Sequence, residues 1–238
     1  MKIFLTDISD MNDDIMNKGL KLVPAYRKDK IERYRFMEDK ERSLAAGLLL
    51  NYATKLYSIY MSYAGEIELK TASDDIFNVK LDELVKSYDT SYDYNIEYAG
   101  NGKPVYSGLD TYFNLSHAGT CVVCAVSDRA VGIDIEGPRK NAIKVAERFF
   151  TQAECDWIGD DSLRFARIWT LKEAYAKLTG DGIAGTVSKV EFRHETAANM
   201  ASVVNMYISG KKADNIKIYE LNIIKQKYVI SAMEYIKN

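Results

Sequence analysis

The chain has 238 residues, of which 47% are hydrophobic and 28% are charged, and its formal net charge at pH 7 is -2. A chain of this length and apolar content can bury one large core or two smaller ones. The nearly balanced charge argues against broad nucleic-acid binding, which needs a basic surface, and no apolar run approaches the ~20 residues of a membrane span.

The first residues predict a short strand and not a targeting segment. Lys2–Thr6 is apolar enough for a strand, but Asp7 interrupts it before a signal core could form. We therefore expect a soluble, cytoplasmic protein.

A helical region is expected from about Lys28 to Tyr60. It is clearest in Arg42–Leu56, where large apolar and aromatic residues recur at four-residue steps. A shorter helix is expected around Leu81–Val85. Gly100-Asn-Gly102 then predicts a reversal of the chain.

Three strand candidates follow at close spacing: Tyr112–Leu115, Thr120–Val126 and Val131–Glu136. The short links favour antiparallel pairing between them. Cys121 and Cys124 lie in the second candidate, where their thiols point to opposite faces of the strand. We interpret them as buried core cysteines and not as a redox pair or a zinc site.

Helices are expected at Ala142–Phe149, from Thr151 onward, and at Leu163–Thr179, with Gly180 and Gly182 ending the last one. The remainder of the chain predicts four more strands: Val190–Arg193, Val203–Ile208, Ile216–Leu221 and Tyr228–Ala232.

The order strand, helix, strands therefore occurs twice, with a boundary near Asp128. We predict an α+β fold of two similar α/β halves, residues 1–128 and 129–238, with the metal motifs in the second. Each half would be a small, mainly antiparallel sheet packed with helices, with a ligand cleft between the halves.

Val131-Gly-Ile-Asp-Ile-Glu136 places two carboxylates on one strand. Residues two apart on a strand face the same side at ~6.6 Å, so Asp134 and Glu136 point together while the apolar residues point away. Magnesium favours a few carboxylates combined with substrate phosphate. The same alternation is also typical of an ordinary strand with one solvated face.

The segment from Trp169 to Lys177 is the most informative part of the chain. As a helix it stacks Trp169, Glu173 and Lys177 on one face, where an acid and a base can serve a metal-bound phosphate. The structural alternative is that Glu173 and Lys177 form only a stabilising helix pair, worth ~0.2–0.5 kcal/mol.

Other motifs are less specific. Thr151-Gln-Ala-Glu154 has the form of a capping box, which competes with any metal role for Glu154. Ser116-His117 does not support a serine nucleophile, because neighbouring side chains diverge and no orienting acid is evident; a phosphate contact suits the pair better. His194 is interpreted as structural. Basic residues available to a phosphorylated ligand are Arg27, Lys28, Lys30, Arg33, Arg42 and Lys103.

The chemistry-bearing motifs occur in one order along the chain. They are Gly102-Lys-Pro104, Phe113-Asn-Leu-Ser-His-Ala-Gly119, Val131-Gly-Ile-Asp-Ile-Glu136, Phe149-Phe-Thr-Gln-Ala-Glu154 and Trp169-Thr-Leu-Lys-Glu-Ala-Tyr-Ala-Lys177. This ordered set resembles the 4'-phosphopantetheinyl transferases, and the length resembles their two-halved, surfactin-synthetase-activating type. Before Gly102 the likeness is limited to the basic helix start and Glu38–Ser43, and after Gly182 nothing is diagnostic.

The resemblance implies a pseudo-dimer of two halves that binds coenzyme A between them. It implies transfer of the phosphopantetheine arm to a serine of an apo acyl or peptidyl carrier protein, with release of 3',5'-ADP. Asp134, Glu136 and Glu173 are the implied magnesium ligands. The implied contacts to coenzyme A are Arg27, Lys30, Arg42, Ser43, Lys103, Ser116, His117 and Lys177. Glu173 and Lys177 are the implied catalytic residues, and Glu173 or a metal-bound water beside it would accept the serine proton.

We expect a monomer, because the short type of the family forms trimers from chains about half this size. Fatty acid and secondary metabolite biosynthesis are both compatible with the sequence, as are magnesium and manganese. Two alternatives remain open. One is a protein that binds coenzyme A or a related nucleotide without turnover, and the other is a structural α/β protein whose Glu173 and Lys177 form only a helix pair.

Overall fold

A computed structural model describes residues 1–63, 76–196, 202–223 and 228–236. The chain divides into two compact units. The N-terminal unit comprises residues 1–99 and 104–129, and the C-terminal unit comprises residues 100–103 and 130–238. Gly100–Lys103 groups with the second unit because its side chains bond to that unit's backbone: Lys103 Nζ donates to the carbonyls of Val131 and Leu178.

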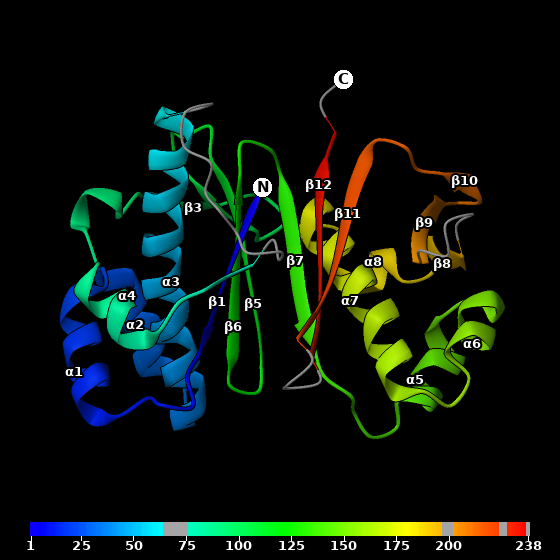
Figure 1. Ribbon diagram of the computed structural model, residues 1–238, viewed down its shortest axis with the longest axis horizontal. Helices are drawn as coiled ribbons and strands as arrows, with labels where there is room; N and C mark the ends of the chain where they lie inside the picture. Colours follow the sequence, from blue (N-terminus) through cyan, green and yellow to red (C-terminus); the bar gives the residue numbers. More distant parts are fainter. Residues whose placement is uncertain (64–75, 197–201, 224–227, 237–238) are drawn as a thin grey trace. The chain divides into compact units, whose positions relative to one another are not determined.

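The N-terminal unit builds a four-stranded sheet in the order β2-β1-β6-β5. Its elements are β1 (Lys2–Asp7), α1 (Asp13–Leu22), α2 (Ala25–Arg33), α3 (Met37–Ser62), β2 (Ile76–Asn78), α4 (Leu81–Lys86), the 3-10 helix η1 (Thr90–Tyr92), β3 (Ile96–Tyr98), β4 (Pro104–Tyr106), β5 (Tyr112–Ala118) and β6 (Cys121–Ser127). Strands β1 and β5 both pair antiparallel to β6, whereas β2 pairs parallel to β1. The long helix α3 lies along this sheet (Figure 1).

The C-terminal unit contains two three-stranded sheets, β11-β12-β7 and β10-β9-β8. Its elements are β7 (Val131–Glu136), α5 (Ala142–Phe149), α6 (Gln152–Ile158), α7 (Ser162–Thr179), α8 (Gly182–Thr186), β8 (Val190–Thr196), β9 (Ser202–Ile208), β10 (Lys211–Lys212), β11 (Ile216–Ile223) and β12 (Tyr228–Tyr235). Helix α7 packs on β7 and β12, as Figure 1 shows. All pairings in these two sheets are antiparallel.

Each unit has its own apolar core. In the first unit, buried leucines of α3 meet the inward residues of β1 and β6. In the second, Phe165, Ile168 and Leu171 of α7 are fully buried and join Phe192 and Met233 of the strands. The predicted α+β class, with small and mainly antiparallel sheets, is confirmed. No helix in the described ranges is long and apolar enough to cross a membrane.

The boundaries of several elements differ from the expectations. The expected helix from Lys28 to Tyr60 is two helices, because Tyr34 and Phe36 adopt extended backbone angles between α2 and α3. Helix α1 was not predicted, although Asn12 caps it by accepting from the Ile15 amide and two aspartates follow in its first turn. Gly182 does not end α7 but begins α8; Gly180, at φ 82°, provides the left-handed cap.

The pairing of the third strand was also predicted wrongly. The sequence favoured pairing of Val131–Glu136 with the strand before it, but β7 pairs with β12, which comes from the far end of the chain. Asp134 stands opposite Ser231 in this register. Short links favour hairpins, yet here the link from β6 leads into a separate sheet.

Candidate functional site

The closest approach of α7 to β7 is set by Gly132. A Cβ added at this glycine would lie 2.0 Å from the carbonyl oxygen of Ala174 and 2.5 Å from the amide nitrogen of Leu178. A glycine inside a strand often marks such a backbone approach. Because α7 crosses the strand here, the residues that follow Gly132 on β7 lie beside the helix face of Glu173 and Lys177.

Asp134 and Lys177 are brought into direct contact by this packing. Lys177 Nζ lies 2.7 Å from Asp134 Oδ1 and also donates to the carbonyl oxygen of Ile133 at 3.2 Å. Asp134 is only 6% exposed, so it does not belong to a solvated strand face. The ammonium therefore binds across two elements and is not limited to a pairing along its own helix.

Two further carboxylates lie within electrostatic reach of this pair. The pKa of Glu173 and the pKa of Glu136 are both raised, first by burial and next by the negative charge of Asp134, while Lys177 pulls each of them down. We call Asp134, Glu136, Glu173 and Lys177 the acid centre. Its three carboxylates repel one another, and a positive charge placed among them would relieve that repulsion.

The residues of the acid centre fit a hard divalent cation in donor type and in charge. Carboxylate oxygens are the ligands that magnesium prefers, and the Lys177 ammonium already binds Asp134 as a cation. No group of three or more His, Cys, Asp or Glu side chains in the described ranges is assembled as a ligand set. The sharing of one ion by Asp134, Glu136 and Glu173 thus stays a prediction.

Arg139, in the loop after β7, was missed by the sequence reasoning. Its guanidinium carbon lies 4.4 Å from the ring centroid of Trp169 and 5.0 Å from that of Phe165. Its charge also lowers the pKa of both Glu136 and Glu173 against the effect of burial. The only sequence signal was an arginine three residues after the second carboxylate of β7.

Lys103 donates hydrogen bonds to the backbone next to the acid centre. Its Nζ lies 2.9 Å from the Val131 carbonyl oxygen and 3.2 Å from that of Leu178, which ties the turn to both β7 and α7. Burial lowers the pKa of Lys103 to about 8. This predicted coenzyme A contact is therefore anchored in the C-terminal unit, where the acid centre lies.

Glu154 has a structural role that the sequence predicted in part. Thr151 and Glu154 form the reciprocal capping box at the start of α6. The same carboxylate accepts from the Phe192 amide at 2.9 Å and pairs at 2.9 Å with Lys172, and both side chains of this pair are 0% exposed. Lys172 also donates to the carbonyls of Val187 and Val190, so the pair ties α6 and α7 to β8.

The remaining candidates lie in the N-terminal unit. Arg42 donates to the carbonyl of Gly119 at 3.1 Å and to Asp39 at 2.7 Å, which joins the start of α3 to the β5–β6 turn. Ser43 is buried, and its hydroxyl has no hydrogen-bond partner in the part of the chain that the structure describes. Ser116 and His117 lie within β5 and not between strands, with Ser116 buried and His117 exposed.

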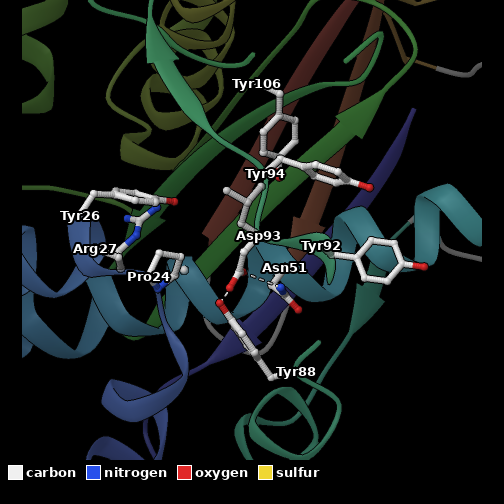
Figure 2. Close-up of a pocket in the computed structure, with 11 residues that line it drawn as sticks. Pro24, Tyr26, Arg27, Asn51, Tyr88, Tyr92, Asp93, Tyr94 and Tyr106 are labelled. Carbon is white, nitrogen blue, oxygen red and sulfur yellow. Dashed lines mark hydrogen bonds between the residues drawn. The ribbon is translucent and has the colours of Figure 1, made fainter. Parts of the chain in front are cut away.

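Arg27 lines a tyrosine-rich pocket of this unit (Figure 2). It is 6% exposed, and its guanidinium lies 5.7 Å from the ring of Tyr26. Asp93, which also lines the pocket, accepts from Tyr88 at 2.5 Å and from Asn51 at 2.9 Å. Burial, followed by the charge of Arg27, lowers the pKa of the neighbouring Lys30.

The other motifs have structural explanations. The His194 ring stacks on Trp157 at 3.8 Å, and its Nε2 lies 3.2 Å from Glu220. Cys121 and Cys124 are both buried in β6. These observations agree with the interpretation of His194 and of the cysteines as parts of the fold.

Comparison with known proteins identifies the family that this chain resembles. A model described as the 4'-phosphopantetheinyl transferase superfamily matches residues 130–232. A 4'-phosphopantetheinyl transferase of Bacillus pumilus, psf-1, is 30% identical over 203 residues, covering 81% of this chain and 75% of that protein.

Two shorter matches agree with the first. The transferase gsp of Aneurinibacillus migulanus is 33% identical over 129 residues, which is 52% of this chain and 50% of the relative. The transferase Sfp of Bacillus subtilis strain 168 is 36% identical over 89 residues, 35% of this chain and 40% of the relative. The family model begins at the residue before β7 and so includes the acid centre.

Proposed function

The chain belongs to the 4'-phosphopantetheinyl transferase superfamily, a family of enzymes, and we propose that it transfers 4'-phosphopantetheine from coenzyme A to a serine of an apo carrier protein. The products would be the holo carrier and 3',5'-ADP. The observation that supports this reaction best is the acid centre, where three carboxylates and one lysine from β7 and α7 lie within electrostatic reach of one another.

In the proposed reaction Asp134, Glu136 and Glu173 hold a magnesium ion. When bound, the ion would neutralise charge on the diphosphate of coenzyme A and stabilise the leaving group. Lys177, which binds Asp134, would donate to a diphosphate oxygen. Two sources of positive charge would then act on an anion that otherwise repels an incoming nucleophile.

Glu173 is the proposed acceptor of the serine proton. A carboxylate at this position, or a metal-bound water beside it, could take the proton as the hydroxyl attacks. The reaction then forms a bond between the serine oxygen and the phosphorus and breaks the bond inside the diphosphate. The electron pair of that bond leaves with 3',5'-ADP.

The nucleotide end of coenzyme A is assigned to basic and hydroxyl residues outside the acid centre. They are Arg27, Lys30, Arg42, Ser43, Lys103, Ser116 and His117. The His117 side chain is exposed and Arg42 is fixed to the turn that follows it, which supports a phosphate contact at this turn. Arg27 and Lys103 are more enclosed, so their contribution is expected through backbone and charge more than through a direct bond.

The test is the intact mass of apo acyl and peptidyl carrier proteins after incubation with coenzyme A, Mg²⁺ and the enzyme. We expect the wild type to add one phosphopantetheine group, chelation of Mg²⁺ to prevent this, and Asp134→Ala or Glu173→Ala to abolish it while the protein stays folded. Asp160→Asn, which changes an exposed acid outside the centre, serves as the control. Wild-type rates in either centre variant would refute the assignment.

A protein that only bound coenzyme A would give stoichiometric binding by calorimetry but no mass gain on any carrier. The panel of carriers also tests whether the enzyme modifies the carrier proteins of fatty acid synthases, polyketide synthases or peptide synthetases. We propose further that the enzyme acts as a monomer in the cytoplasm, which size-exclusion chromatography with light scattering and fractionation would test.

A further inference from the structure

Helix α7 carries a column of three functional side chains on one face: Trp169, Glu173 and Lys177, each four residues after the last. The column spans ~12 Å along the helix axis, at 1.5 Å per residue. Lys177 marks one end, where it binds Asp134. Trp169 marks the other end, and its ring is covered by the guanidinium of Arg139.

The stacking fixes Arg139 without using its donors. The guanidinium carbon lies 4.4 Å from the Trp169 centroid and 5.0 Å from that of Phe165, and these two rings are themselves stacked. In the described part of the chain, no hydrogen bond or ion pair engages the guanidinium of Arg139. A guanidinium placed over a ring can keep its in-plane N–H groups available, and these match two phosphate oxygens at once.

Arg139 lies next to the acid centre, because it follows Glu136 by three residues and covers Trp169, one helical turn before Glu173. In the described residues the guanidinium forms no ion pair with Glu136 or Glu173, although its charge lowers the pKa of both. Arg148 provides a contrast, since it lies on α5 over the ring of Phe149 at 5.1 Å and not over Trp169.

From this geometry we infer that Arg139, held on the ring of Trp169, is a substrate-binding residue that contacts the diphosphate of coenzyme A from the opposite side to Lys177. This inference rests on the proposed function, because it assumes that the acid centre receives a diphosphate. It also gives Trp169 a role, which is to present the guanidinium and not only to fill space.

The test compares two ligands by calorimetry in the presence of Mg²⁺. Coenzyme A contains the diphosphate, whereas adenosine 3'-phosphate carries the adenine and the ribose 3'-phosphate without either phosphate of the diphosphate. Loss of a hydrogen bond between charged groups is worth ~1.5–3 kcal/mol, so Arg139→Gln should weaken coenzyme A binding by at least about tenfold. Its affinity for adenosine 3'-phosphate should change much less, and Arg148→Gln should match the wild type for both ligands.

Each other result would overturn the inference. If R139Q binds coenzyme A with unchanged affinity, Arg139 does not contact the diphosphate. If R139Q loses the same affinity for both ligands, Arg139 contacts the nucleotide end instead. A raised KM for the carrier with normal coenzyme A affinity would assign Arg139 to carrier docking. If R139Q does not fold, Arg139→Lys is the second test, since lysine keeps the charge but not the paired donors. A folded R139K with wild-type affinity for coenzyme A would refute the inference.

The two proposals fail in different ways. If the wild type does not modify any carrier, the proposed function is wrong. If the wild type modifies a carrier and R139Q binds coenzyme A as tightly as the wild type, only the role of Arg139 is wrong.

Discussion

The buried pair of Glu154 and Lys172 allows a sharp prediction about the stability of the C-terminal unit. Lys172→Met leaves the Glu154 carboxylate fully buried, with two backbone amides but no opposite charge. Breaking a buried ion pair by removing one partner typically costs about 3–5 kcal/mol of stability. The change also removes the donor to the Val187 and Val190 carbonyls, which adds to the loss.

A double-mutant cycle separates the charge from these other losses. Glu154→Gln keeps an acceptor for the Phe192 amide but removes the negative charge. The double variant should therefore be less destabilised than the sum of its two single variants, by about 2–3 kcal/mol, because contacting residues are not additive. Lys144→Met, which changes an exposed lysine in the same unit, should leave the stability unchanged.

Urea unfolding followed by tryptophan fluorescence is the appropriate assay. The chain has two tryptophans, Trp157 and Trp169, and both lie in the C-terminal unit, so the signal reports this unit alone. A K172M protein within about 1 kcal/mol of the wild type would contradict the assignment of a tight buried pair. Additive single variants would contradict it as well.

Three further predictions concern the surroundings of the acid centre. Gly132→Ala should destabilise the C-terminal unit by at least about 1–3 kcal/mol and reduce transfer, because its Cβ would clash with the backbone of α7; wild-type melting and activity would refute this. Burial lowers the pKa of Lys103 from 10.5 to about 8, so between these two pH values the unfolded state binds more protons than the folded state. The stability of the wild type relative to Lys103→Met should therefore rise with pH in this window. Equal pH profiles of the two proteins would contradict the burial of a charged amine. Glu173→Gln should abolish transfer but raise the melting temperature of the metal-free protein at pH 7. The raised pKa of Glu173 means that its negative charge destabilises the folded state above its ordinary pKa of 4.5, and glutamine removes that charge. A lowered melting temperature would show that the charge stabilises the fold.

The sequence predicted local features well where one residue type has one strong explanation. Thr151 and Glu154 form the capping box that their spacing indicates, and Gly180 ends α7 in the left-handed conformation. The family prediction, based on ordered motifs, is confirmed by the comparisons.

Features that depend on distant contacts could not be predicted in the same way. The pairing of β7 with β12 joins segments far apart in the chain, and no local signal indicates it. Lys172 lies on the apolar side of α7, which could have suggested a buried partner, but the partner on α6 is visible only in the fold. Arg139 lies in a loop without periodicity, so its stacking on Trp169 required the structure.

The proposed reaction requires Asp134, Glu136 and Glu173 to bind one divalent ion, so the metal affinity of the protein is its most direct test. Titration of Mn²⁺ into the protein with coenzyme A, followed by electron paramagnetic resonance, should show one tightly bound ion in the wild type. Asp134→Asn, Glu136→Gln and Glu173→Gln should each weaken that ion strongly, whereas Asp160→Asn should not. Wild-type Mn²⁺ affinity in all three centre variants would show that these carboxylates do not share the ion.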